Sequence, residues 1–329
     1  MLFFMLLMIG TLITISSYNW FSMWIGLEIN LLSIMPLFKS NFNTFPAEAT
    51  IKYFIVQALA STFILFSIII SMNSFEYTPF SNNYWLSMIL NSGLLTKLGA
   101  APFHTWFPEV SEGLNWLNNF ILMTWQKIAP SILLMYNINT LFFTYIIIIS
   151  SLIGGIYGLN QMSLRKILAY SSINHIGWML ASMFFFKSIW INYFLIYSII
   201  NLNIMMIFYY FNIFYINQLF NLLNSNKLVK LIFMFNFFSL GGLPPFLGFY
   251  PKWLTLNLMI NGHFYFISLI LVITTLITLF FYIRLTFSSL TLSFNETINP
   301  MKFKHQKTII FNSIVLMGLL ISVNSWNFL

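Results

Sequence analysis

The amino-acid sequence contains no cysteine and no aspartate, and only 6% of its 329 residues are charged. Without cysteine, disulfides, thiolate-ligated iron–sulfur clusters and thiol chemistry are excluded. The four histidines are scattered without the spacing of a zinc site, and the chain has neither a G-x-G-x-x-G nor a Walker motif. The chain therefore has no evident means of binding a metal, a nucleotide or a redox centre of its own.

Apolar side chains make up most of what is present. Hydrophobic residues account for 59% of the chain and the mean hydropathy is +0.85. Apolar runs of about 17–25 residues, the length needed for a helix to cross a bilayer, recur along the whole chain. This composition predicts an all-α, polytopic membrane protein. The net charge of +8 does not indicate a nucleic-acid partner, because most of the basic residues flank the apolar runs.

The apolar runs predict eleven membrane helices, joined by short connections into a single integral membrane domain. They lie near 2–18, 20–38, 48–72, 83–103, 115–137, 140–158, 164–185, 189–213, 229–258, 264–286 and 308–327. The first run lacks the basic start and the cleavage site of a signal peptide, so we expect it to be retained as a span.

The basic residues indicate how these helices are oriented. Only Lys187 falls at a connection after an odd-numbered span. The connections after even-numbered spans carry Lys39, Lys52, Arg165, Lys166, Lys227, Lys230, Lys302, Lys304 and Lys307. By the positive-inside rule, the N-terminus then lies on the side of the membrane that holds the basic connections, and the C-terminus lies on the other side.

Two similar motifs interrupt the apolar pattern: PFHTWFP at 102–108 and PFLGFYP at 245–251. Proline breaks a helix, and a broken helix persists in a membrane only where its backbone is buried in protein or lines a wet cavity. One motif falls in the fourth predicted span and the other in the ninth. Half of the ten prolines lie at these two places, namely Pro102, Pro108, Pro244, Pro245 and Pro251.

The positions of the two motifs predict an internal repeat. Residues 1–137 and 138–290 would each form a five-helix unit with a discontinuous fourth helix, and 291–329 would add a C-terminal helix. Because five is odd, the second unit enters the membrane from the opposite face, which gives the inverted repeats of many secondary transporters. The alternative is a chance similarity between two Gly/Pro-rich packing kinks.

Several ionisable residues are expected at membrane depth. They are Glu28 in the second span, Lys97 just before the first motif, Lys127 in the fifth span, His175 in the seventh and Lys252 just after the second motif. Each ionised group near the bilayer centre costs about 2.5–3.5 kcal/mol on insertion scales, and such residues usually mark ion pathways or proton relays.

Structural roles are the alternatives for these residues. Glu28 and one lysine could form a structural ion pair, Lys252 could extend to the interface, and His175 could be a neutral packing residue. His104, within the first motif, could serve only to satisfy freed carbonyls.

Three other acidic residues are expected near connections. Glu48 and Lys52 have the spacing of a helix-end pair. Glu109 and Glu112 follow the first motif in what reads as a connection, where they would be solvated or would contact a neighbouring subunit.

The charges at depth favour protons over metal ions as the transported species. Three lysines face a single glutamate, and full ionisation would leave unpaired positive charge in a medium of low dielectric. At least one lysine should therefore be near-neutral at some stage, as expected of a group that accepts and releases protons. A path for metal ions would favour carboxylate oxygens, of which only one is at depth.

Six segments together resemble a known family over nearly the whole chain. They are GLEINLLSIMP, EATIKYFIVQALAS, KLGAAPFHTWFPE, MTWQKIAP, LNQMSLRKILAYSSINHIGWM and SLGGLPPFLGFYPKW. The chain resembles the antiporter-like, proton-pumping membrane subunits of respiratory complex I, particularly the chain 2 subunits of insect mitochondria. That family is related to multi-subunit sodium/proton antiporters.

The resemblance implies a proton relay in the mitochondrial inner membrane. Glu28 would pair with Lys97, Lys127 would be the central lysine, His175 would lie on the polar axis and Lys252 would lead toward the exit. Family members generally have fourteen helices, so eleven would correspond to a chain shortened by three at its N-terminus. NADH, FMN, iron–sulfur clusters and ubiquinone would be bound by other subunits, and this chain would bind no cofactor or metal. The partners would be other membrane subunits of the complex and lipids such as cardiolipin.

Two other functions remain open at this point. The chain could be a non-conducting scaffold that links neighbouring membrane subunits, or a free-standing cation/proton antiporter. The single carboxylate at depth counts against the second alternative.

Overall fold

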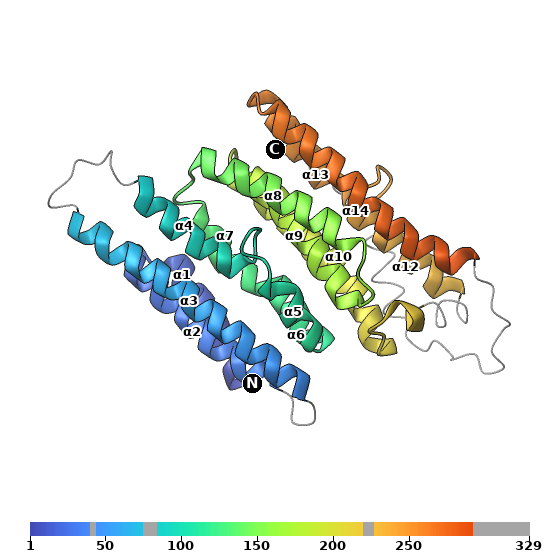
Figure 1. Ribbon diagram of the computed structural model, residues 1–329, viewed down its shortest axis with the longest axis horizontal. Helices are drawn as coiled ribbons and strands as arrows, with labels where there is room; N and C mark the ends of the chain where they lie inside the picture. The colour runs from blue at the N-terminus through green and yellow to red at the C-terminus, as the bar shows by residue number, and fades with distance from the viewer. Residues whose placement is uncertain (40–43, 75–83, 220–226, 292–329) are drawn as a thin grey trace. The chain divides into compact units, whose positions relative to one another are not determined.

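The computed structural model describes residues 1–39, 44–74, 84–219 and 227–291, and in these ranges the chain is helical (Figure 1). Their only strand-type pairing is an isolated bridge between Ser163 and Tyr215. In chain order the helices are α1 (Leu2–Ser16), α2 (Trp20–Phe38), α3 (Thr44–Ser74), α4 (Tyr84–Leu98), α5 (Trp106–Gly113), α6 (Trp116–Met123), α7 (Trp125–Leu134), α8 (Thr140–Gly158), α9 (Leu164–Met183), α10 (Lys187–Phe211), α12 (Lys227–Gly241), α13 (Phe249–Asn261) and α14 (Tyr265–Thr291).

The chain divides into two compact units, Met1–Ser150 and Ser151–Leu329. In the first unit, α3 packs against α2, α4 and α5, and α7 packs against α4 and α1. In the second unit, α10 packs against α9, α12 and α13, and α14 packs against α12 and α13. The dividing point lies inside α8, whereas the sequence predicts a boundary before that helix.

The longest helices are apolar on the outside and partly polar on the inside. On α14, large apolar side chains are exposed at Phe266, Leu269, Ile273, Leu276 and Phe280. The same helix buries Ser268, Thr274, Thr278 and Thr286. This distribution is the reverse of that in a soluble protein and is typical of a helix that faces lipid.

Five continuous helices of the described ranges are long and apolar enough to cross a membrane. They are Trp20–Phe38, Thr44–Met72, Thr140–Gly158, Lys187–Phe211 and Tyr265–Phe287. Helix α1 is apolar but shorter. The predicted helix at 308–327, and with it the C-terminal part 291–329 of the predicted arrangement, lies outside the described residues apart from the last residue of α14.

Both proline motifs interrupt a helix. The predicted span at 83–103 ends as α4 at Leu98, and the chain resumes as the short helix α5; the residues between them are the first break (99–105). The predicted span at 229–258 is divided into α12 and α13 by the second break (242–248).

The two breaks begin with the same backbone hydrogen bonds. At the first break, Gly99 N–H bonds to the Thr96 carbonyl and Ala100 N–H to the Leu95 carbonyl, both at 3.1 Å. This is the Schellman motif, which ends a helix at a residue in the left-handed conformation. Gly99 occupies that position with a φ of 74°.

The second break repeats this pattern at the same offset that separates the two proline motifs. Gly242 N–H bonds to the Ser239 carbonyl at 3.1 Å and Leu243 N–H to the Phe238 carbonyl at 3.3 Å. Gly242 has a φ of 79°. The helix therefore ends in each case at the glycine, and the prolines that follow prevent it from resuming at once.

The prediction of one continuous helix over 115–137 is wrong, because the structure divides this span at Thr124. The Thr124 hydroxyl donates to the Phe120 carbonyl at 2.7 Å, which competes with the helical hydrogen bonds of that turn. Downstream, Pro130 supplies no N–H to the helix. The interruption places Lys127 in the first turn of α7.

Replacing Gly99 with alanine should lower the free energy of unfolding by about 1–2 kcal/mol, the cost of the left-handed conformation for an L-residue. The added Cβ would also lie 3.1 Å from the Phe107 ring. The thermal unfolding midpoint of the chain in lipid nanodiscs measures the effect. Gly155→Ala is the control, because its Cβ would lie 3.5 Å from the nearest neighbouring atom and helix α8 favours alanine. Equal midpoints for the two variants would contradict the prediction.

Candidate functional site

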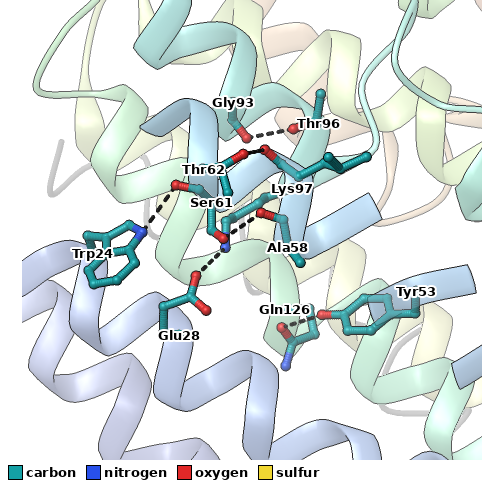
Figure 2. Close-up of polar contacts among 11 residues, drawn as sticks. Trp24, Glu28, Tyr53, Ala58, Ser61, Thr62, Gly93, Thr96, Lys97 and Gln126 are labelled. Carbon is teal, nitrogen blue, oxygen red and sulfur yellow. Dashed lines mark hydrogen bonds and ion pairs between the residues drawn. The ribbon is translucent and has the colours of Figure 1, made fainter. Parts of the chain in front are cut away.

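The structure brings Glu28 of α2 close to Lys97 in the last turn of α4. The Lys97 Nζ and Glu28 Oε1 atoms lie 3.9 Å apart, and the two side chains are 4% and 25% exposed, respectively. Figure 2 shows the amine directed toward the carboxylate, with Ser61 of α3 close to its other side. Breaking this pair is costly on the lysine side, because Lys97 is buried and would be left as an uncompensated charge.

A chain of polar side chains continues from this pair into α7. The Tyr53 hydroxyl donates to Gln126 Oε1 at 3.3 Å, and Gln126 Nε2 donates to Asn30 Oδ1 at 2.8 Å. These bonds connect α3 and α2 through α7, one residue before Lys127. Figure 2 shows the Tyr53–Gln126 contact beside the Glu28–Lys97 pair.

A small polar cavity lies at the centre of this cluster. Its volume of about 10 Å³ suffices for about one water molecule. Its polar lining consists of Asn30, Tyr53, Gln57, Lys97 and Gln126. Gln57 is 3% exposed, and its Nε2 has no hydrogen-bond partner among the described residues. A water molecule in this cavity would therefore have several polar groups to bind.

Lys127 is buried in the first turn of α7, with 2% of its surface exposed. Its Nζ lies 5.5 Å from the centroid of the Phe107 ring, a cation–π distance. Phe107 belongs to α5, directly after the first break. The first break and the interruption at Thr124 are thus both close to this lysine.

In the second unit, His175 of α9 is buried among tyrosines of α10. The His175 Nδ1 atom and the Tyr193 hydroxyl lie 2.8 Å apart, and the ring centroids of His175 and Tyr197 lie 5.1 Å apart. A cavity of about 10 Å³ is bordered by these three side chains and by Leu240, Gly248 and Pro251 of the second break region. The histidine and the broken helix therefore share a space for about one water molecule.

Lys252 of α13 is buried against the end of α12. Its Nζ donates to the Leu240 carbonyl at 3.1 Å and to the Gly241 carbonyl at 2.9 Å. It also lies 5.9 Å from the centroid of the Trp178 ring. The sequence contains no acidic residue between Glu112 and Glu296. In the part of the chain that the structure describes, this ammonium contacts two backbone oxygens and no carboxylate.

The remaining ionisable residues have local roles. The His104 Nδ1 atom lies 3.3 Å from the Pro102 carbonyl within the first break. Glu109 belongs to helix α5, so the prediction of a connection at this position is wrong. Lys52 contacts Glu48 at 3.0 Å and Glu109 at 3.1 Å, and all three side chains are well exposed.

The predicted site residues therefore fall into two clusters. Glu28, Lys97 and Lys127 belong to the first unit, and His175 and Lys252 to the second. Within the described ranges no group of histidine and acidic residues could hold a metal ion.

Sequence reasoning missed the neutral partners Asn30, Tyr53, Gln57, Gln126, Tyr193 and Tyr197. Their sequence signal is weak but present: Tyr53 and Gln57, and likewise Tyr193 and Tyr197, are four residues apart and so share one helix face within apolar runs.

Comparison with known proteins identifies related sequences. Residues 17–278 match the family model described as NADH:quinone oxidoreductase/Mrp antiporter, transmembrane. The chain is 48% identical to NADH-ubiquinone oxidoreductase chain 2 of Anopheles gambiae over 324 residues, which cover 97% of this chain and 95% of that one. It is also 48% identical to the chain 2 protein of Aedes aegypti, over 97% of this chain and 96% of that one.

The chain is also similar in fold to solved structures. A chain of respiratory complex I from Thermus thermophilus with bound aureothin superimposes with a TM-score of 0.86 and 23% identity. The match covers 98% of this chain and 78% of that one.

Replacing Tyr193 with phenylalanine should destabilise the second unit by about 1–3 kcal/mol, because the buried hydrogen bond between the His175 Nδ1 atom and the Tyr193 hydroxyl is lost. The thermal unfolding midpoint in lipid nanodiscs measures the loss. Tyr209→Phe is the matched control, since Tyr209 is 42% exposed and its hydroxyl loss should have little effect. A Tyr193→Phe midpoint equal to that of the control would show that the hydroxyl contributes nothing.

Proposed function

The chain belongs to the NADH:quinone oxidoreductase/Mrp antiporter family of membrane proteins, and from this we propose that it is an antiporter-like, proton-translocating membrane subunit of mitochondrial respiratory complex I. The observation that carries the proposal is the burial of Lys97 and Lys127 in one unit, with the partly buried Glu28 paired to Lys97, and of His175 and Lys252 in the other, beside interrupted helices. Buried ionisable groups at breaks in membrane helices are typical of ion-transport pathways.

We propose a topology of eleven spans, built from two inverted five-helix repeats and a C-terminal helix. The shared Schellman geometry at Gly99 and Gly242 supports corresponding fourth helices in the two repeats. The distribution of basic residues supports an N-terminus in the matrix and a C-terminus in the intermembrane space.

Electron transfer in this proposal takes place in other subunits. NADH, FMN, iron–sulfur clusters and ubiquinone are bound there, and this chain contributes only the membrane part of the coupling. Neighbouring membrane subunits of the complex are its direct partners, and cardiolipin is a candidate lipid.

The first step of the mechanism is a change at the Glu28–Lys97 pair. While the carboxylate lies beside the amine, the pair keeps Lys97 charged. A signal from quinone reduction that separates the pair leaves an uncompensated positive charge, which favours release of the proton held by Lys127. The polar cavity and the Tyr53–Gln126–Asn30 hydrogen bonds provide polar groups between α2, α3 and α7 for this response.

The later steps use the residues of the second unit. The released proton passes through water to His175 and from there to Lys252. The cavity that borders both His175 and the Leu240 end of α12 supports the last of these transfers, because Leu240 supplies a carbonyl to Lys252.

A non-conducting scaffold is the second candidate function. It is favoured by the two carbonyl bonds of Lys252, which a purely structural lysine would also make. A free-standing cation/proton antiporter is less well supported, because Glu28 is the one acidic residue placed in the buried polar cluster of the described ranges.

Neutralising the relay should uncouple proton pumping from electron transfer. In inner-membrane vesicles, Glu28→Gln and Lys127→Met should lower the number of protons pumped per NADH oxidised, while electron transfer in the other subunits persists. Lys39→Gln, a change at an exposed lysine, is the control and should pump normally. Normal stoichiometry in both relay variants would favour the scaffold.

The absence of cysteine makes the topology directly testable. Cysteine placed at Tyr18, which is 99% exposed between α1 and α2, should react with a membrane-impermeant maleimide from the intermembrane space. Cysteine at Lys39, after α2, should react only from the matrix. Mass spectrometry of this chain identifies the modified residue, and labelling of both positions from one side would contradict the proposed orientation.

A further inference from the structure

The end of α12 leaves two backbone acceptors open. A Schellman motif satisfies the carbonyls two and three residues before the last helical residue. At the second break these are the carbonyls of Ser239 and Phe238, which accept from Gly242 and Leu243. The next two carbonyls, of Leu240 and Gly241, accept from no backbone N–H of the described residues, because the chain turns away after Gly242.

Lys252 donates to both of these carbonyls, at 3.1 and 2.9 Å. The lysine is 6% exposed, so the bonds are made away from water. The carbonyl end of a helix carries roughly half an elementary negative charge. Among the described residues no carboxylate lies within ion-pair distance of Lys252, so this helix end is the negative group that the structure places against the ammonium.

Gly242 makes the approach of the lysine possible. A Cβ at this position would lie 2.8 Å from Lys252 Cδ and 3.0 Å from its Nζ. Both distances are shorter than ordinary van der Waals contacts. A side chain at position 242 would therefore require the end of Lys252 to shift from its present position at the two carbonyls.

The first break begins with the same Schellman hydrogen bonds but has a different residue at the position that corresponds to Lys252. At the offset that relates Gly99 to Gly242, the counterpart of Lys252 is Glu109. Glu109 points to the surface, where it pairs with Lys52. The amine site is therefore a specific feature of the second break and not a requirement of the Schellman geometry.

We propose that the Leu240 and Gly241 carbonyls form an ammonium-binding site that takes the place of a carboxylate partner for Lys252, and that Gly242 is the positioning residue of this site. The role of this site in proton transfer rests on the proposed function. In that function the site would hold Lys252 at the position from which it accepts and releases a proton. The binding site itself is independent of whether protons are pumped.

The experiment compares glycine substitutions in two backgrounds. Gly242→Ala is made in the native chain and together with Lys252→Gln, within the complete complex in membrane vesicles. Gly155→Ala of α8 is the control, because its Cβ would lie 3.5 Å from the nearest neighbouring atom and it takes no part in the site. Gly242→Ala in the Lys252→Gln background supplies the stability cost of the left-handed conformation at this position, whose φ is 79°, without the lysine.

Thermal unfolding tests the site. Gly242→Ala should lower the unfolding midpoint by more in the native chain than in the Lys252→Gln background, where only the cost of the left-handed conformation remains. Gly155→Ala should not lower the midpoint. An equal loss from Gly242→Ala in both backgrounds would overturn the inference, because the glycine would then act without the lysine.

Proton pumping tests the role of the site in proton transfer. Gly242→Ala should reproduce the loss of pumping caused by Lys252→Gln and change the pH dependence of the pumping that remains, and Gly155→Ala should do neither. If the midpoints show coupling but Lys252→Gln pumps normally, the ammonium site stands and the relay role of Lys252 in the proposed function is wrong. If Lys252→Gln loses pumping and Gly242→Ala keeps it with an unchanged pH profile, positioning by Gly242 is overturned and the relay survives.

Discussion

The structure depends on one constraint: a backbone polar group in hydrocarbon must find a partner within the protein. A continuous helix meets this constraint by itself, and each break in a helix has to meet it by other means. Both breaks use a Schellman motif for the first carbonyls. In the second break a lysine side chain reaches the next two carbonyls. At the second break, the backbone groups that make an interrupted helix unsuitable for lipid are the groups that bind the buried Lys252.

The two units handle a buried positive charge differently. In the first unit, Lys97 faces the carboxylate of Glu28, a side chain that can rotate away or accept a proton. In the second unit, Lys252 faces carbonyls that are fixed in the backbone and cannot be protonated at ordinary pH. A mobile partner suits a group that must respond to a signal, and a fixed partner suits a group that must stay in place. This difference agrees with a proposed relay that is triggered at Glu28 and ends at Lys252.

Local sequence patterns predicted much of the fold. The apolar runs gave the positions of most helices, because in lipid the length and hydropathy of a run nearly determine its structure. Glycine and proline marked the two breaks, since their backbone preferences act locally. The interruption at Thr124 was missed, because it arises from one side-chain hydrogen bond in a segment whose composition is otherwise helical. The residues 308–327 lie outside the described structure, so the helix expected there stays a prediction.

The candidate site was less predictable. Charge within an apolar run drew attention to Glu28, Lys97, Lys127, His175 and Lys252, because burying a charge is costly wherever it occurs. Their neutral partners, such as Gln126 and Tyr193, have no such signal, because their role depends on which helices pack together. The carbonyl partners of Lys252 could not be predicted at all. They are backbone atoms, and their availability follows from the conformation of Gly242 and not from the type of residue that carries them.

The matched positions of Glu109 and Lys252 have a genetic consequence. The backbone of each break is determined by glycine and proline, whereas the position after the last proline holds an acid in one break and a base in the other. Glutamate and lysine codons differ by a single nucleotide, so one point mutation can reverse the sign of the charge beside a break without altering the glycine and proline residues that form the break. Two breaks of the same kind can therefore come to carry a surface carboxylate in one case and a buried lysine in the other while the chain still folds.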